Sequence, residues 1–436
     1  NVASQWKGEV QNLGRLEAIE AKLESLLKDL EMAKGAYWSS MGTDNSNNTV
    51  VDSKLPISME NTTVYLGDKN DPVSVGDPII VGERMYFAYG STLYCYDLKG
   101  NKIMEAPLYT SIGFFSRITY GDGKIFVPLS SRMQAFDAQT LKPLWVSKDV
   151  GKQMVSTVTY NDGYVYSGFT SGGGGNTDPT NGAFFCISTK DEDPNDSYEE
   201  KDFVWTSPTG GYYWAGATVV GNKIYYAGDA GVLYAHHLTE DITYDSYDLG
   251  GQVRANLVYD KDSGRIYAAT KTNPNVYAIP LKADGTFDRA YIKKTKDNVV
   301  GGLTGGLAVC NGRVYTPSGG MHASNALTVL DADTLDYIYA YEGIESQSIP
   351  LITTAYATAE NDYTIYLYVN GMKNGVGYIL RESRNQKAPY VQDTITGGTL
   401  YNSTSMKADQ YGNLYWIGGS NSPKYMLTIF ANNSGA

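Results

Sequence analysis

The fold of this chain is decided by residues 221–247, which begin Gly-Asn-Lys-Ile-Tyr-Tyr-Ala-Gly-Asp-Ala-Gly-Val-Leu-Tyr-Ala-His-His-Leu and end Ile-Thr-Tyr-Asp-Ser-Tyr. The stretch predicts three short strands, because apolar residues alternate along it and Asn222 and Gly231 fall at turn positions. Similar stretches recur along the sequence. Their repetition indicates an architecture, but it names neither a ligand nor a reaction.

Each repeat carries an aromatic residue on its expected second strand, and eight such anchors are found: Tyr86, Phe126, Tyr166, Tyr225, Tyr267, Tyr315, Tyr366 and Tyr415. Neighbouring anchors lie 40 to 59 residues apart, which suits a unit of four strands with insertions. Such a unit cannot bury both of its faces alone, whereas a closed ring of units leaves no long exposed edge. The sequence therefore predicts an all-β fold, an eight-bladed β-propeller of four-stranded antiparallel blades.

The last unit, around residues 406–430, offers three strands before the sequence ends. The stretch from Thr62 to Leu66 reads as a further strand that precedes the first complete repeat. We expect it to complete the last blade as its outermost strand. The predicted organisation is a helical segment at residues 1–36 followed by a propeller at residues 37–436.

Residues 8–35 form the helical segment, with apolar side chains stepping by three and four residues at Leu16, Ile19, Leu23, Leu26 and Leu30. Glu24 and Lys28 are spaced to pair on the polar side. We expect an amphipathic helix docked on the body of the domain. The alternative is a helix used for dimerisation or for binding a partner.

The composition excludes several classes of partner. The chain has 436 residues, a formal net charge of -12 and a pI near 4.8, which argues against binding nucleic acid or an anionic membrane surface. No apolar run is long enough to span a bilayer, so we expect no membrane insertion. The first residues lack the pattern of a signal peptide, and we expect any export signal to lie outside this sequence.

Two repeats carry a family resemblance. Gly-Asn-Lys-Ile-Tyr-Tyr-Ala-Gly with Gly-Val-Leu-Tyr-Ala, and Ala-Phe-Asp-Ala-Gln-Thr-Leu-Lys-Pro-Leu-Trp at 135–145, resemble the repeats of the PQQ-type, or quinoprotein dehydrogenase-like, eight-bladed propellers. The resemblance covers about residues 40–434. It implies the fold rather than an activity, because similar repeats occur in dehydrogenases, in the lipoprotein that helps to assemble outer-membrane barrels and in non-enzymatic surface proteins. The stretch 210–217 looks like exported members of the family.

The sequence departs from the family's alcohol dehydrogenases, which carry an adjacent cysteine pair and a calcium-binding set over the quinone. This chain has three cysteines, Cys95, Cys186 and Cys310, and no two are adjacent. Cys95 and Cys186 alternate with apolar neighbours, which is typical of buried thiols. We therefore expect no bound cofactor and, in particular, no PQQ.

Loops that lead into the innermost strands of a propeller converge on one mouth of its channel. We expect a ligand there, because aromatic rings can stack on a sugar, peptide or flat cofactor while polar groups bond to it. For each aromatic residue the alternative is that it fills the channel. The candidate ligand-binding residues are Phe114, Phe115, Tyr213, Trp214, Arg254, His322 and Asn402.

Other candidate sites favour structural interpretations, and we assign no catalytic residue and no metal site. The four glycines at 172–175 lack the lysine of a phosphate-binding loop, and the acidic stretch 191–200 matches no calcium loop. His236 and His237 are adjacent, so on a strand they point to opposite faces and cannot share a metal.

We therefore expect a monomeric, non-catalytic binding or scaffold module of an exported cell-envelope protein, at the cell surface or outside the cell. Its expected ligand or partner is a glycan, a peptide or a protein. The alternatives are an enzyme, either a degenerate quinone-dependent dehydrogenase or a carbohydrate-active propeller, and an envelope assembly scaffold.

Overall fold

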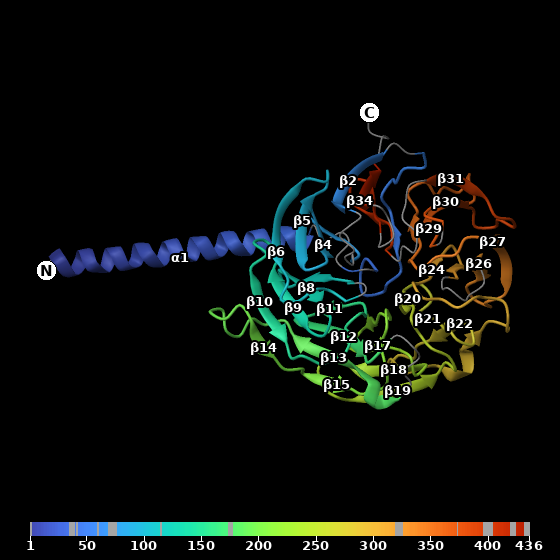
Figure 1. Ribbon diagram of the computed structural model, residues 1–436, viewed down its shortest axis with the longest axis horizontal. Helices are drawn as coiled ribbons and strands as arrows, with labels where there is room; N and C mark the ends of the chain where they lie inside the picture. The colour runs from blue at the N-terminus through green and yellow to red at the C-terminus, as the bar shows by residue number, and fades with distance from the viewer. Residues whose placement is uncertain are drawn as a thin grey trace.

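The strands of the computed structural model form eight sheets in a ring around a central channel (Figure 1). This arrangement confirms the predicted eight-bladed β-propeller. The structure describes residues 2–34, 40, 42–58, 61–68, 76–113, 116–172, 178–318, 326–372, 374–395, 404–418 and 424–430.

In chain order the first four blades are β3–β6 (Ile79–Val81, Arg84–Tyr89, Thr92–Asp97, Lys102–Pro107), β7–β10 (Thr119–Gly121, Lys124–Pro128, Met133–Asp137, Pro143–Ser147), β11–β13 with β15 (Thr159–Asn161, Tyr164–Thr170, Gly182–Ser188, Trp205–Ser207) and β16–β19 (Thr218–Val220, Lys223–Tyr226, Val232–His237, Thr243–Asp248). A short strand, β14 (Glu199–Lys201), adds to the outer edge of the second blade by parallel pairing with β10.

The fifth to eighth blades are β20–β23 (Val258–Asp260, Arg265–Ala269, Val276–Pro280, Lys293–Lys294), β24–β27 (Ala308–Cys310, Arg313–Pro317, Ala326–Asp331, Tyr337–Glu342), β28–β31 (Leu351–Thr353, Ile365–Asn370, Gly377–Glu382, Val391–Ile395) and β32–β34 with β2 (Lys407–Ala408, Leu414–Ile417, Lys424–Phe430, Asn61–Asp68). The first strand of each blade lies nearest the channel.

Tight turns between the first and second strands follow from the local sequence. In three blades the turn is Asp122–Gly123, Asp162–Gly163 or Asn311–Gly312, and both residues of each pair have positive φ. A two-residue turn of this kind matches the twist of the strands that it joins, and Asp, Asn and Gly tolerate the left-handed conformation that it needs.

The predicted aromatic anchors all lie on the second strands of their blades, where most of them fasten one blade to the next. Five of the tyrosine hydroxyls donate to a backbone carbonyl in the loop between the third and fourth strands of the following blade. The pairs are Tyr86 with Ala138, Tyr166 with Leu238, Tyr225 with Gly285, Tyr267 with Ala332 and Tyr415 with Leu98, at 2.6–2.9 Å. The repeat thus encodes a contact between blades as well as a strand.

At two junctions where the anchor donates no hydrogen bond to the next blade, other side chains bond across the junction. Phe126 has no hydroxyl, and in the same blade Trp145 Nε1 donates to the carbonyl of Thr189 in the third blade, at 3.2 Å. Between the sixth and seventh blades, the hydroxyls of Tyr339 and Tyr341 donate to the buried carboxyl group of Glu382.

The outermost strand of the eighth blade comes from the N-terminal part of the chain. β2 pairs antiparallel with β34 along seven residue pairs, from Asn61 opposite Phe430 to Asp68 opposite Lys424. The blade therefore joins residues from the two ends of the sequence, and the strand lies where the stretch 62–66 was expected.

Residues 42–58, which we call the strap, run along the inner strands of six consecutive blades. Asn45 Nδ2 donates to Tyr160 O in the third blade, Asn47 Nδ2 donates to Ala217 O and Leu257 O, and further bonds reach the sixth, seventh and eighth blades. Within the strap, β1 (Val50–Val51) pairs parallel with β28. Figure 1 shows this blue segment inside the ring.

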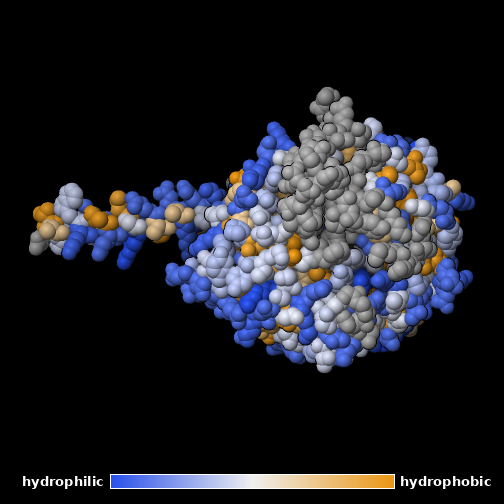
Figure 2. Space-filling model, in the orientation of Figure 1, coloured by the Kyte–Doolittle hydropathy of each residue, from blue (hydrophilic) through white to orange (hydrophobic). Residues whose placement is uncertain are grey.

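The N-terminal helix, α1 (Val2–Lys34), does not dock on the propeller as we expected. It extends away from the ring (Figure 1), and apolar side chains remain visible along it in Figure 2. Leu16, Ile19, Leu23, Leu26 and Leu30 are all more than half exposed. Met32, near the C-terminal end of α1, packs against the core between the first two blades.

Replacing an anchor hydroxyl is expected to loosen one junction between blades. Tyr267→Phe removes the bond to Ala332 O and leaves that carbonyl with only the longer bond from Arg265, so the free energy of unfolding is expected to fall by about 0.5–1.5 kcal/mol. Urea denaturation followed by tryptophan fluorescence measures the change. Tyr337→Phe, at an exposed tyrosine, is the control and should change nothing.

Glu382 gives the stability a recognisable pH dependence. Burial raises the pKa of its carboxyl group from 4.5 to about 7, although the bonds from Tyr339 and Tyr341 and the charge of Arg313 oppose this shift. The folded chain therefore holds this proton between pH 4.5 and 7 while the unfolded chain releases it. The stabilisation is complete below pH 4.5 and is lost as the pH rises to 7.

Glu382→Gln should remove the pH-dependent part of the unfolding free energy that this carboxyl group contributes. Relative to the unmodified chain, the variant is expected to gain up to about 3 kcal/mol in unfolding free energy between pH 4.5 and 7, because 2.5 units of pKa correspond to that energy. Denaturation at several pH values tests this difference. An identical pH profile for the two proteins would contradict it, and Glu360→Gln, at an exposed site, is the control.

Candidate functional site

A network of buried polar side chains crosses the channel where the first strands begin. Arg117 Nε lies 3.7 Å from the Asp77 carboxylate, and Arg117 Nη1 donates to the carbonyl of Trp214 at 2.8 Å. Thr157 Oγ1 donates to the same carbonyl at 3.3 Å and contacts Asn256 Oδ1 at 3.1 Å. Residues from the first, second, third and fifth blades are thereby connected through the segment that leads into the fourth.

A second buried ion pair lies beside this network. Arg254 Nε is 3.7 Å from the Asp229 carboxylate, and the Arg254 guanidinium lies over the Tyr213 ring, 4.4 Å from its centroid. The Tyr213 and Trp214 rings are 5.0 Å apart, and the Arg117 guanidinium lies 5.7 Å from the Trp214 centroid. Two cation–aromatic contacts therefore meet at this pair of rings.

The structure brings three of the predicted site residues together. The Tyr213 ring contacts both Arg254 and Trp214, and of these three residues only Tyr213 is partly exposed. Trp214 is 5% exposed and packs with Val155 and Tyr213, so it offers little surface to a ligand. The other four candidates, Phe114, Phe115, His322 and Asn402, lie outside the residues that the structure describes.

The backbone at Trp214 adopts an unusual conformation. Its φ is 63°, in the left-handed region that tryptophan rarely occupies. The bonds that its carbonyl accepts from Arg117 and Thr157 hold this conformation in place. Strained backbone persists only where its surroundings fix it, and these two bonds supply that constraint next to Tyr213.

The pKa values of nearby groups show how strongly the site is desolvated. Burial lowers the pKa of the Lys407 ammonium to about 8; the charge of Asp77 opposes this shift and that of Arg117 adds to it. Burial likewise lowers the pKa of Lys271, which lies near Arg254. Burial raises the pKa of Tyr213, while Arg254 and Arg117 act in the opposite direction.

Sequence reasoning missed Asp77, Arg117 and Lys407. The sequence nevertheless held a signal, because one position of the repeat is polar in three successive blades. It lies nine residues before the anchor, and it is Asp77 before Tyr86, Arg117 before Phe126 and Thr157 before Tyr166. The same position in the fourth blade is Gly216, where an added Cβ would meet Asn256 Oδ1 at 2.1 Å. One position of the repeat therefore supplies side chains to the channel.

The candidates that we interpreted as structural have local partners. His236 is fully buried, its ring centroid lies 4.0 Å from that of Trp205, and it bonds to Asp241. Within the acidic stretch, the Glu199 carboxylate accepts the backbone amides of residues 192 and 193. Among the described residues, no group of three or more His, Cys, Asp or Glu side chains could hold a metal ion.

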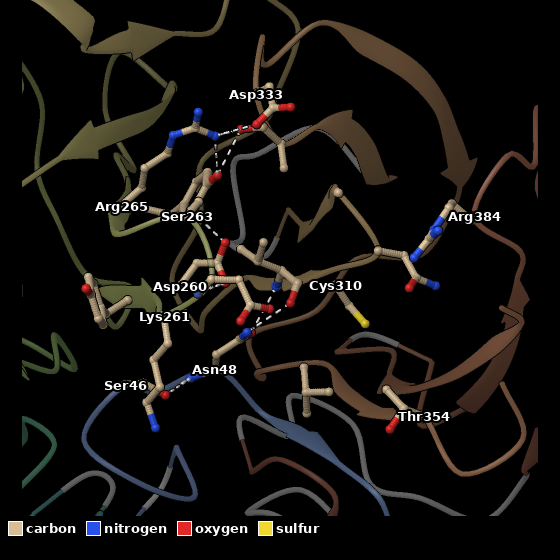
Figure 3. A pocket seen from close by; sticks show the side chains of 18 of the residues that line it. Ser46, Asn48, Asp260, Lys261, Ser263, Arg265, Cys310, Asp333, Thr354 and Arg384 are labelled. Carbon is tan, nitrogen blue, oxygen red and sulfur yellow. Dashed lines mark hydrogen bonds and ion pairs between the residues drawn. The ribbon is translucent and has the colours of Figure 1, made fainter.

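A polar cavity of about 830 Å³ lies on another part of the molecule, at turns of the fifth, sixth and seventh blades and beside the strap. Figure 3 shows Arg384 across the cavity from Asp260 and Lys261. Lys261 pairs with Asp44 of the strap at 3.1 Å, and Ser263 donates to Asp260 at 2.6 Å.

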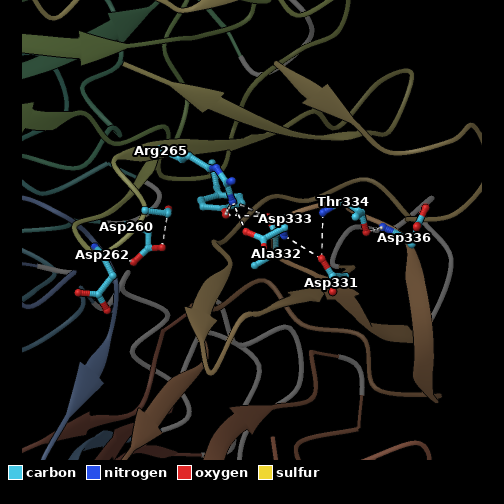
Figure 4. Close-up of polar contacts among 10 residues, drawn as sticks. Asp260, Asp262, Arg265, Asp331, Ala332, Asp333, Thr334 and Asp336 are labelled. Carbon is cyan, nitrogen blue, oxygen red and sulfur yellow. Dashed lines mark hydrogen bonds and ion pairs between the residues drawn. The ribbon is translucent and has the colours of Figure 1, made fainter. Parts of the chain in front are cut away.

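The wall of this cavity is a junction between blades. Arg265 pairs with Asp333 at 2.6 Å and also donates to the carbonyl of Ala332, which accepts the Tyr267 hydroxyl as well (Figure 4). The Asp331 carboxylate accepts the amides of Asp333 and Thr334, which is the usual chemistry of a turn. These bonds serve packing between blades rather than a ligand.

Comparison with solved structures shows that the fold is similar to those of methanol and alcohol dehydrogenases and of BamB. A europium-containing methanol dehydrogenase matches with a TM-score of 0.67 at 10% identity, covering 92% of this chain and 100% of that chain. Quinohemoprotein alcohol dehydrogenase from Comamonas testosteroni gives 0.66 at 12% identity, with 92% and 82% covered. BamB from Moraxella catarrhalis gives 0.58 at 11% identity, with 86% and 99% covered.

These likenesses show the fold alone, because all three identities are low. No protein-family model matches the chain, and no curated protein matches it by sequence. The predicted resemblance to the quinoprotein dehydrogenase-like propellers is confirmed at the level of the fold.

Breaking the buried ion pair should destabilise the propeller far more than breaking an exposed one. Asp77→Ala leaves the Arg117 guanidinium, which is 1% exposed, without its carboxylate, and the expected loss of unfolding free energy is about 3–5 kcal/mol. Asp202→Ala breaks the exposed pair with Lys148 and should lose at most about 1 kcal/mol. Equal losses in urea denaturation would contradict this account.

Proposed function

We propose that this chain is a non-catalytic binding module of an exported cell-envelope protein, and that it binds a glycan at the channel mouth. The observation that carries the proposal is the partly exposed residue Tyr213, whose ring lies against the Arg254 guanidinium and next to the strained backbone of Trp214. A tyrosine face held in this way is a stacking surface for a sugar ring. The fold is compatible with a binding module but does not identify the ligand, since propellers of this type have many roles.

The charges around Tyr213 favour a glycan with carboxylate groups. Arg117 and Arg254 lie beside this ring, Lys271 lies near Arg254, and Lys407 lies near Arg117. Two carboxylates, Asp77 and Asp229, each pair with one of the arginines. A third buried carboxylate, Glu345, lies on the segment that leads into β28.

A glycosidase at this site is less well supported. Hydrolysis of a glycosidic bond uses two carboxyl groups, one of which must donate a proton. Here Asp77 and Asp229 each form a buried ion pair with an arginine at 3.7 Å. Such carboxylates position the arginines rather than acting as proton donors.

The residues of this chain do not fit the quinone site that the family resemblance implies. Cys95 and Cys186 lie within the blade cores on β5 and β13, and burial raises the pKa of both thiols. The Trp214 indole is covered by Arg117 and by Tyr213. We therefore derive no step through PQQ, and the absence of this cofactor remains part of the proposal.

The location outside the cytoplasm and the role of a protein partner also remain proposals. No helix among the described residues is long and apolar enough to cross a membrane. The likeness to BamB makes an assembly scaffold the second candidate, with α1 as the observation that favours it, because this helix exposes apolar side chains away from the blades.

Binding of a uronic-acid polymer tests the proposed function. Isothermal titration with polygalacturonate is expected to show saturable binding, and its methyl-esterified form should bind at least about tenfold more weakly because it lacks the charges. Tyr213→Ala should weaken binding by about tenfold, which is 1.4 kcal/mol. Tyr291→Ala, at a tyrosine 68% exposed on the outside of the ring, is the matched control.

Two results would contradict the proposal. One is the absence of saturable binding to either polymer. The other is tight binding to polyglutamate with no binding to polygalacturonate, because that would identify an acidic peptide as the ligand. Uptake of stoichiometric PQQ with calcium, followed by absorbance, would instead support the dehydrogenase.

A further inference from the structure

Helix α1 carries a continuous apolar stripe that nothing in the chain covers along the described residues. Its members, which we call the α1 seam, are Trp6, Val10, Leu13, Leu16, Ile19, Leu23, Leu26 and Leu30, and all of them are 51–67% exposed. They follow one another in steps of three or four residues, and the mean step is close to the 3.5 residues of a left-handed coiled coil.

A helix of this kind needs a partner. It is 33 residues long and contains Gly8 and Gly14, whose added Cβ atoms would meet nothing within 4 Å. Most helical stability in proteins comes from packing of an apolar face, and glycine weakens a helix interior. Soluble proteins rarely expose a continuous apolar patch unless it is an interaction surface.

The charges beside the seam indicate which partner fits. From Leu16 onward the seam follows a heptad pattern, with Leu16, Leu23 and Leu30 at position a and Ile19 and Leu26 at position d. Arg15 then falls at position g and Glu20 at the next position e. Neither has an oppositely charged residue three or four positions away in its own helix.

In a parallel pair of identical helices, a g residue of one helix faces the following e residue of the other. Arg15 of each copy then meets Glu20 of its partner, which gives two opposite-charge pairs across the seam. The next such pair is Lys22 opposite Leu27, where the lysine stem can cover the apolar side chain without like-charge repulsion.

We propose that α1 pairs in parallel with α1 of a second copy of this chain, so that two propellers are held side by side by a coiled coil. The proposal goes beyond the binding function and departs from the monomer expected from the sequence. Because Met32, near the end of α1, packs against the first two blades, parallel pairing places both propellers at the same end of the coiled coil.

Light scattering coupled to size-exclusion chromatography tests the proposal on the full chain. At concentrations from about 1 to 100 µM, the mass is expected to be twice the 47.6 kDa of the monomer. Leu23→Glu should give a monomer. Near-ultraviolet circular dichroism should remain unchanged, since Leu23 is more than half exposed on a helix that extends away from the ring.

Charge reversal tests the parallel alignment separately. Arg15→Glu should raise the dissociation constant of the dimer by about tenfold, because two glutamates would then face each other at each pair. The double variant with Glu20→Arg should restore the original value. Lys28→Glu, on the outer side of the helix at position f, is the matched control and should leave the dimer intact.

The result that would overturn the proposal is a mass of 47.6 kDa at every concentration, or a mass of three copies. A dimer that Leu23→Glu does not disrupt would place the interface elsewhere and would also overturn it. A double variant no tighter than Arg15→Glu alone would contradict the parallel alignment.

Discussion

A ring of eight blades must be closed, and here the N-terminal part of the chain performs the closure in two ways. β2 supplies the outermost strand of the last blade, so that blade joins residues more than 350 positions apart in sequence. The strap then bonds to the inner strands of six blades. Closure removes the free sheet edge that an open row of blades would expose.

The contacts between blades make this closed ring rigid enough to hold a strained site. Tyrosine hydroxyls on second strands reach the neighbouring blade at five junctions, and other side chains do so at two more. Each bond is modest, but together they fix the spacing of the inner strands. That spacing lets Arg117 reach both Asp77 and the carbonyl of Trp214, which keeps Tyr213 in a single position.

Much of the fold could be predicted from the sequence because it depends on a local pattern. Each anchor marks a second strand, and the stretch that contains Tyr213 and Trp214 precedes an inner strand, so both features follow from the repeat. The channel network was harder to predict, since Asp77, Arg117 and Lys407 look like ordinary strand-end residues until the ring brings them together. The exposed helix could not be predicted either, because an apolar stripe does not reveal whether the same chain or a second copy covers it.

The functional account depends on the same geometry. If the strap and the blades hold the inner strands in place, the partly exposed ring of Tyr213 and the cations around it form a preorganised surface, which limits the ordering that a ligand has to impose. The helix is a separate feature. Its seam contacts neither the channel nor the strap among the described residues, so binding and self-association can be tested independently.

Hydrogen–deuterium exchange on Asn47→Gly tests the closure most directly. Glycine tolerates the φ of 56° at this position, so the variant removes only the side-chain bonds to Ala217 and Leu257. The account predicts faster amide exchange in β16 and β20, which lie at least 170 residues away in sequence, and unchanged exchange in β4 and β5 of the first blade. Unchanged protection in β16 and β20 would contradict the claim that the strap holds the inner strands together.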